Sequence, residues 1–144
     1  MRKFQFELSR ILDWRRRQLE VEETKLAPLL AEQRAIETER AATEREETEA
    51  NVAIATVHST TGEELAAFDA YRLYLKDVRK RIESRLANCA NSIEKQRQAI
   101  VTARRQVRLL ERLKERRRNE WQAAADREQE NLAAELYLAR WRQP

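Results

Sequence analysis

The single glycine of this 144-residue chain, Gly62, separates two long stretches in which apolar residues recur with coiled-coil spacing. Upstream, positions that step alternately by four and three residues from Leu8 to Val57 are apolar at nine of 15 places. Downstream, the same stepping from Leu65 to Trp121 is apolar at 12 of 17 places. An apolar period of about 3.5 residues held over so many turns indicates helices that pack along a seam.

The interval between the two stretches, residues 58–62, carries turn and capping signals. Thr60 with Glu63, and Thr61 with Glu64, have the spacing of a capping box, in which the hydroxyl and the carboxylate bond backbone N–H groups at a helix start. We expect Gly62 to supply a positive φ at the chain reversal. The sequence therefore predicts one helix from about residue 5 to 57, a turn at 58–62, and a second helix from about residue 62 to 141.

The charge pattern predicts how the two helices pair. If the chain reverses at the turn, residues 32–49, with seven acidic and three basic side chains, face residues 70–87, with six basic and two acidic ones. A parallel homodimer would instead place the acidic block against its own copy. In the reversed arrangement Glu47 would face Arg72, and Glu22 would lie beside Gln96 and Arg97.

Composition agrees with this architecture, since 38% of the residues are charged and the chain has one Gly and two Pro. We expect an all-α fold in which two long helices form an antiparallel coiled-coil hairpin, the second helix is longer and projects past the first, and residues 1–144 form a single rod. Pro28 removes a backbone hydrogen bond within the first helical pattern. Because the register continues beyond it, we expect a kink near residues 24–28 without a chain reversal.

Catalysis, metal binding and cofactor binding find no support in the sequence. The single histidine, His58, lies at the predicted turn, and one glycine is too few for a glycine-rich phosphate loop. Cys89 lies in the seam register, where we expect a small buried apolar residue. No apolar run approaches the roughly 18 residues needed to span a bilayer, and the N-terminal residues lack the apolar region of a signal peptide. We therefore expect a cytoplasmic protein that is not an enzyme and has no cofactor.

Two segments depart from simple coiled-coil patterning, and the first is the start of the second helix. There apolar residues occupy the seam and outer positions together. Exposed apolar surface of this kind marks interaction sites. The candidates for contact with a partner at this tip are Phe68, Tyr71, Tyr74 and Leu75. The alternative is a stiffened tip, or self-association of two tips.

The second segment is the C-terminal part of the second helix. Opposite the start of the first helix the second has reached about residue 114, so roughly 28 residues would project alone. A lone helix gains most of its stability from packing, so we expect it to dock on a partner. The candidate contacts are Trp121, Leu132, Leu136 and Trp141. In the alternative, the apolar residues beside the base of this projection fold back locally as a small aromatic plug: Phe4, Phe6, Ile11 and Trp14.

The base of this projection is basic. Residues 2–17 have a net charge of +4 and residues 102–117 of +5, although the whole chain has only +4. Like charges on adjacent helices cost stability unless an anionic surface lies against them, either an acidic protein cavity or phosphate. The alternative is a charged end that is simply solvated. We take Arg15, Arg16 and Arg117 as the candidate contacts. Nonspecific binding of nucleic acid is therefore an alternative function, although no groove-reading module is visible.

The run from Lys3 to Leu12, followed by Arg15 and Arg16, resembles the start of flagellar export proteins of the FliJ family. The run from Leu109 to Arg116, continuing to residues 127–130, resembles the family's later part. The resemblance spans almost the whole chain in layout, and the counterpart stalk of type III secretion injectisomes is similar.

This resemblance implies a non-enzymatic central stalk of a type III protein export apparatus, active in bacterial flagellum biogenesis. The terminal end would bind and stimulate the hexameric export ATPase, and the tip would reach the cytoplasmic domain of the membrane export gate. Export chaperones are further implied partners. The protein would be cytoplasmic and peripheral to the inner membrane. The alternatives are a basic coiled coil that binds nucleic acid and a homo-oligomeric structural rod.

Overall fold

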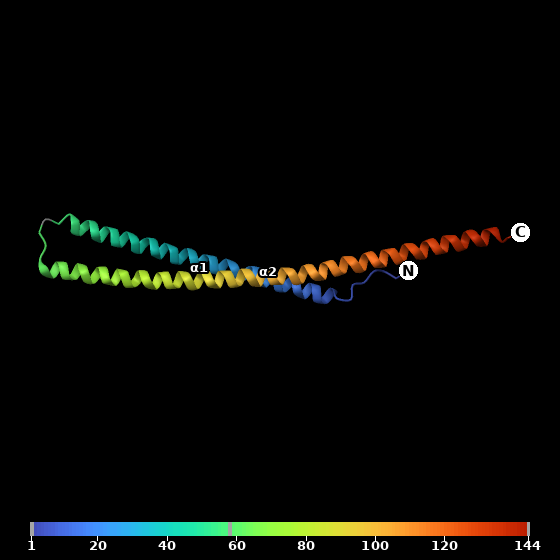
Figure 1. Ribbon diagram of the computed structural model, residues 1–144, viewed down its shortest axis with the longest axis horizontal. Helices are drawn as coiled ribbons and strands as arrows, with labels where there is room; N and C mark the ends of the chain where they lie inside the picture. The colour runs from blue at the N-terminus through green and yellow to red at the C-terminus, as the bar shows by residue number, and fades with distance from the viewer. Residues whose placement is uncertain (1, 58, 144) are drawn as a thin grey trace. The chain divides into compact units, whose positions relative to one another are not determined.

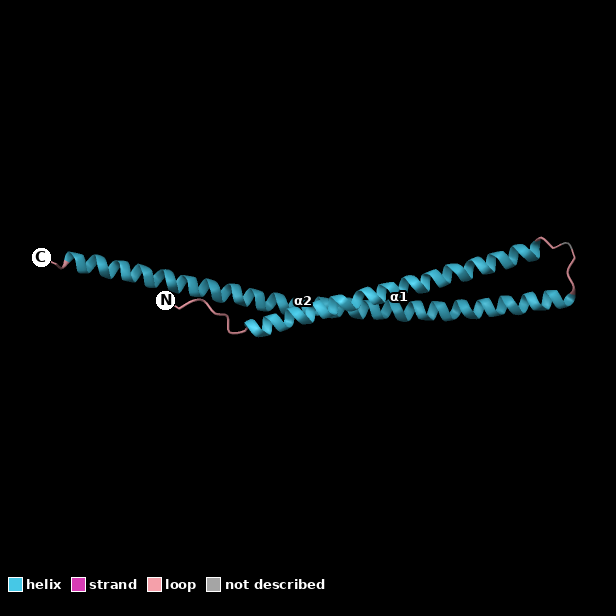
Figure 2. Cartoon of the chain, turned by 180° about the vertical axis from the view of Figure 1, so that it is seen from behind, coloured by secondary structure: helices cyan, strands magenta, loops and turns pink. Residues whose placement is uncertain are grey.

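The computed structural model describes residues 2–57 and 59–143 and contains two long helices. Helix α1 spans Ser9–Ala55 and helix α2 spans Gly62–Trp141, with 47 and 80 residues. The described part of the chain contains no strand, as Figures 1 and 2 illustrate. The predicted all-helical fold is therefore confirmed, as are the bounds of the second helix. Of the predicted turn, His58 lies outside the described residues.

The chain divides into two compact units, and each contains a part of both helices. One unit comprises Met1–Val21 with Ile100–Pro144, and the other comprises Glu22–Ala99. The expectation of a single rod stays a prediction.

The unit of Glu22–Ala99 has its core between α1 and α2. Ile36 packs with Ile82, Cys89 and Ile93, and partly buried apolar residues surround them: Leu26, Leu29, Leu30, Val78 and Leu86. All but Leu30 and Val78 belong to the predicted seam register. Fully burying one such side chain contributes about 1.5–3 kcal/mol, so this cluster is a major source of the unit's stability.

Cys89 behaves as the sequence predicts. Its side chain is buried, and its Sγ lies 3.6 Å from the backbone oxygen of Leu29. Burial, with a smaller effect from the charge of Glu32, raises the pKa of the Cys89 thiol. A thiol that stays protonated is a poor nucleophile. Cys89 is therefore a packing residue of the core.

In the other unit the buried apolar residues are Leu12, Ile100, Ala103, Val107 and Ala125. Helix α1 begins at Ser9, so the predicted start near residue 5 is wrong. Residues 2–6 have no helical structure, and apolar and polar residues alternate there. Phe4, Phe6 and Leu8 are half-buried, whereas the residues between them are exposed. This period of two is typical of an extended segment, which places three apolar side chains on one face.

The start of α2 corrects one expectation and confirms another. Gly62 is the first residue of the helix and has no positive φ, so its predicted role in the reversal is wrong. Of the two capping boxes that the sequence allows, the structure contains the second. The Glu64 backbone N–H donates to Thr61 Oγ1 at 3.3 Å, and the Thr61 backbone N–H donates to Glu64 Oε2 at 3.4 Å.

Pro28 lies inside α1, and the helix continues through it without interruption. The predicted continuation is therefore confirmed, and the predicted bend stays a prediction.

Ion pairs between the helices follow the predicted charge pattern with one change of partner. Glu47 pairs with Arg79 and not with the expected Arg72. The prediction assumed that residue numbers in α2 fall by as much as those in α1 rise. From the pair of Glu22 with Gln96 to the pair of Glu47 with Arg79, the number instead rises by 25 in α1 and falls by only 17 in α2. The guanidinium of Arg40 lies 3.8 Å from Glu44 on its own helix and 3.6 Å from Glu83 on α2.

Two carboxylates at the helix interface are held by direct hydrogen bonds. Gln96 Nε2 donates to the backbone oxygen of Glu22 at 2.7 Å and to its Oε2 at 2.6 Å, as the sequence predicts for this pair. The hydrogen bond from Gln96 to the Glu22 carboxylate lowers the pKa of Glu22, and a second hydrogen bond from Lys25 lowers it further. Arg85 Nη1 lies 2.6 Å from Glu39 Oε2, and its hydrogen bond lowers the pKa of Glu39.

Thr61→Ala should lower the free energy of unfolding by about 0.5–2 kcal/mol, because the helix start loses the hydroxyl that accepts from Glu64 N–H. Urea denaturation followed by circular dichroism measures the change. Thr60→Ala is the matched control, since it removes the same atoms one residue earlier. An equal or larger effect at Thr60 would contradict the assignment of Thr61 as the cap.

Glu39→Gln should reduce stability near neutral pH and lose that effect in acid. The folded-state pKa of Glu39 is lowered from 4.5, so the wild-type stabilisation is present above that value and disappears as pH falls through the lowered pKa. Urea denaturation of both proteins across this pH range measures the difference. The control is Glu37→Gln, at an exposed carboxylate without an ion-pair partner in the described chain. A difference that persists at the acid end would contradict the role of the Arg85 bond.

Candidate protein-binding surfaces

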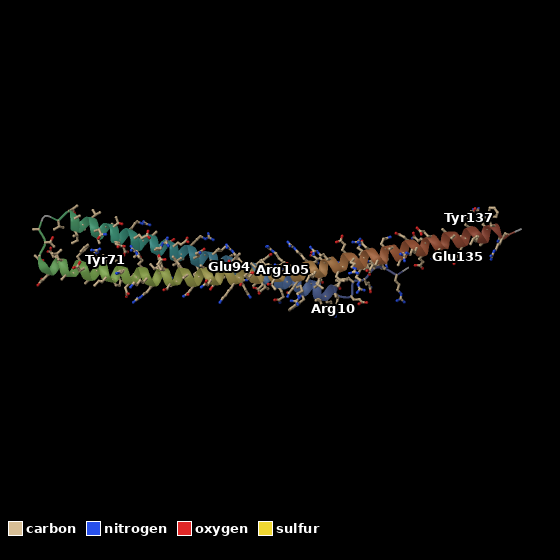
Figure 3. All side chains as sticks on the ribbon, viewed as in Figure 1. Arg10, Tyr71, Glu94, Arg105, Glu135 and Tyr137 are labelled. Carbon is tan, nitrogen blue, oxygen red and sulfur yellow. The ribbon has the colours of Figure 1, made fainter. Side chains whose placement is uncertain are left out.

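Exposed large apolar side chains gather in two segments of α2. The first, which we call the tip surface, comprises Leu65, Tyr71, Leu73 and Tyr74. Leu73 and Tyr74 are 68% and 61% exposed, so these apolar side chains pack on little of this chain. The rings of Tyr71 and Tyr74 lie 6.4 Å apart and are nearly parallel, and Figure 3 labels Tyr71.

Two residues near the tip surface differ from their predicted positions. Leu75, a candidate for partner contact, is only 2% exposed, so its side chain belongs to the packing between the helices. Leu65, which the register places in the seam, is 48% exposed. The interface therefore loosens toward the turn. Phe68 lies between these extremes, half-buried, with the Arg72 guanidinium 5.8 Å from its ring centre.

The second segment lies near the end of α2, and we call it the tail surface. Its members are Leu132, Leu136, Tyr137, Leu138 and Trp141, each more than half exposed. Every described residue from 126 to 143 is exposed. Figure 3 shows Glu135 and Tyr137 on this part of α2, which has no other segment of its unit beside it.

The tail surface covers more than one side of the helix. With 3.6 residues per turn, Leu132 and Leu136 lie on the same face as Trp121 and Ala125, whereas Trp141 lies on the opposite face. The rings of Tyr137 and Trp141 are 6.3 Å apart. A helix that is apolar on several sides is typical of a helix enclosed by other protein.

The lone part of α2 is shorter than the predicted 28 residues. The extended N-terminal residues lie against α2, where Phe4 contacts Trp121 with ring centres 6.0 Å apart. Ala125 is buried as well, so the uncovered part begins at residue 126. The alternative of a local aromatic plug is thus correct for Phe4 and Trp121. The alternating pattern of residues 3–8 is the sequence signal that would have predicted this cover.

The three candidate arginines at the base differ in the contacts that they already make within this chain. Arg15 Nη1 donates to Gln106 Oε1 at 2.7 Å, and its guanidinium lies 4.8 Å from the Trp14 ring centre. Arg16 pairs with Glu111 at 3.3 Å. By contrast, Arg117 is exposed and lines a groove between α2 and residues 2–8. Of the three, Arg117 is therefore the most available to a partner.

Further positive charge lies on the outer face of α2 in the same unit. Arg105, Arg108 and Arg112 are exposed, and Figure 3 labels Arg105. Leu109 lies among them with 64% of its surface exposed, a feature that the sequence reasoning did not select.

The described residues contain no cluster of His, Cys, Asp or Glu side chains that could hold a metal ion. Neither helix contains, within the described residues, a stretch long and apolar enough to cross a membrane. In comparisons with known proteins, no family model, no curated protein and no solved structure matches this chain significantly.

Proposed function

We propose that this chain is an antiparallel coiled-coil hairpin that serves as the non-enzymatic central stalk of a type III protein export apparatus of the flagellar kind. The observation that carries the proposal is the end of α2. Its last 16 helical residues are exposed, and their apolar side chains occupy opposite faces. Such a segment gains stability by entering a partner that surrounds it.

The contacts within each unit support the antiparallel arrangement. In the unit of Glu22–Ala99, rising positions in α1 contact falling positions in α2: Glu22 with Gln96, Leu29 with Cys89, and Glu39 with Arg85. In the other unit, Arg15 of α1 contacts Gln106 of α2, and Phe4, which precedes α1, contacts Trp121 farther along α2. Pairs of this kind are those of two helices that run in opposite directions along a seam.

The proposed partner of the tail is the hexameric export ATPase. A ring has a central cavity, and a cavity can bury all sides of one helix. Leu132, Leu136 and Trp141 are the proposed apolar contacts of this cavity. Arg117 and Trp121, at the base, would contact its rim, and Arg15 and Arg16 add positive charge there while remaining bonded within the unit.

The proposed partner of the tip surface is the cytoplasmic domain of the export gate. Tyr71 and Tyr74 supply exposed aromatic area, which is enriched among the residues that dominate binding energy. Phe68 adds a half-buried ring beside them, and Leu75 is left out because it is buried. This role places the protein in the cytoplasm beside the inner membrane, where export chaperones are further partners.

A second candidate function is binding of nucleic acid. It is favoured by Arg105, Arg108 and Arg112, which are exposed without ion-pair partners among the described residues. Such a stripe fits phosphate contacts that do not depend on sequence.

The test is ATP turnover by the export ATPase of the same genome, with this chain added across a range of ratios. The wild type should stimulate turnover and saturate near one chain per hexamer. The variant Leu136→Ser with Trp141→Ser should need at least about tenfold more protein, because two exposed anchors worth about 1–2 kcal/mol each are lost.

The matched control is Leu73→Ser with Tyr74→Ser, which removes two equally exposed apolar side chains from the tip surface of the same helix. It should stimulate like the wild type. Equal loss in both variants, or no stimulation by the wild type while the ATPase assembles, would overturn the proposal. Retention on DNA that falls steeply with salt would then favour the second function.

A further inference from the structure

Beside the apolar stripe in the tail of α2, acidic residues come first and basic residues follow. Packing of the apolar stripe alone would not require this sequence of charges. Leu132 and Leu136 lie on one face of the helix, with Gln129 and Ala139 before and after them on the same face. Beside this stripe, the first half of the segment has Asp126 and Glu128, and the second half has Arg140 and Arg142. All of these side chains are exposed.

We propose that this stripe pairs with the same stripe of a second copy of the chain, in antiparallel orientation about a twofold axis near residue 134. Leu132 then packs on Leu136 of the second copy, and Gln129 packs on Ala139 of the second copy. Each layer occurs twice, because a twofold interface uses the same surface on both chains. The spacing of these residues alternates by three and four, as the seam of an antiparallel coiled coil requires.

The flanking charges select this orientation. Antiparallel pairing places Asp126 opposite Arg140 and Glu128 opposite Arg142, so symmetry yields four attractive pairs. Only Glu135 meets its own copy. Parallel pairing would yield two attractive pairs, between Glu135 and Arg140, and would bring together the two basic segments of residues 102–117, each with a net charge of +5.

The charged groups are available for these contacts. Glu128, Arg140 and Arg142 have no ion-pair partner within the described part of the chain. Asp126 accepts one hydrogen bond, from Gln122 Nε2 to its Oδ1 at 3.0 Å, which leaves Oδ2 for a second donor. Self-pairing would cover Leu132 and Leu136 and leave Trp141 on the opposite face.

Sedimentation of the full-length chain over a range of concentrations, without any partner, tests the inference independently of export. The average mass of the wild type should rise from 17.1 kDa toward twice that value. Glu128→Arg should weaken association at least about tenfold, because in both copies the introduced guanidinium then lies opposite Arg142 of the other copy. Arg142→Glu should weaken it to a similar extent, through two pairs of facing carboxylates.

Mixing the two variants supplies the decisive comparison. A pair with one copy of each variant has opposite charges at both places, so the mixture should associate as strongly as the wild type. The control, Glu130→Arg, makes the same charge change on the outer side of the helix and should leave association unchanged. A wild type that stays monomeric at every concentration, single variants that associate normally, or a mixture without recovery would each overturn the inference. Both proposals use Leu132 and Leu136, so one tail pairs either with a second copy or with the ATPase. Failure of self-pairing leaves the ATPase proposal standing, because that proposal is tested by ATP turnover with the ATPase present.

Discussion

The burial of a narrow apolar stripe between α1 and α2 is the interaction on which the rest of the structure depends. A single helix in water is stabilised little by its own backbone, so Ile36, Ile82, Cys89 and Ile93 hold their unit by packing across the seam. Where this packing ends, the helix surface changes character. Beyond Ala125 no described residue is buried, and exposed apolar side chains remain that the chain itself does not cover.

Polar contacts along the seam fix the alignment of the two helices more than they add to the free energy of unfolding. Gln96 bonded to Glu22, and Arg15 bonded to Gln106, are satisfied in only one alignment of the two helices. The exposed ion pairs, such as Arg85 with Glu39, add little to the free energy of unfolding, because water and salt screen their charges. Their charges favour one pairing of the segments, and the apolar core provides the free energy.

Much of the fold follows from local patterns, and the corrections concern features that depend on packing. The apolar period predicted α2 and the core positions, and spacing predicted the Thr61 capping box as one of two possibilities. The register alone does not predict the pair of Glu47 with Arg79, because the alignment of α1 with α2 shifts toward the turn, where the two helices pack less closely. For the same reason Leu65 is exposed while Leu75 is buried. Phe4 covers Trp121, as the alternative of an aromatic plug predicts. The helix predicted from about residue 5 does not account for this contact, because residues 3–8 alternate and α1 begins only at Ser9.

The antiparallel pairing of α1 with α2 within one chain is the central claim, and a disulfide tests it directly. Cys89 Sγ lies 3.6 Å from the backbone oxygen of Leu29, and Leu29 packs against the apolar cluster that contains Cys89. We therefore expect Leu29→Cys to bring a second thiol within reach of Cys89. Mild oxidation should then link residues 29 and 89 within one chain, with the mass of a monomer, and Ile54→Cys should form no such link. A disulfide-linked dimer, or equal linkage from position 54, would contradict the pairing described for α1 and α2.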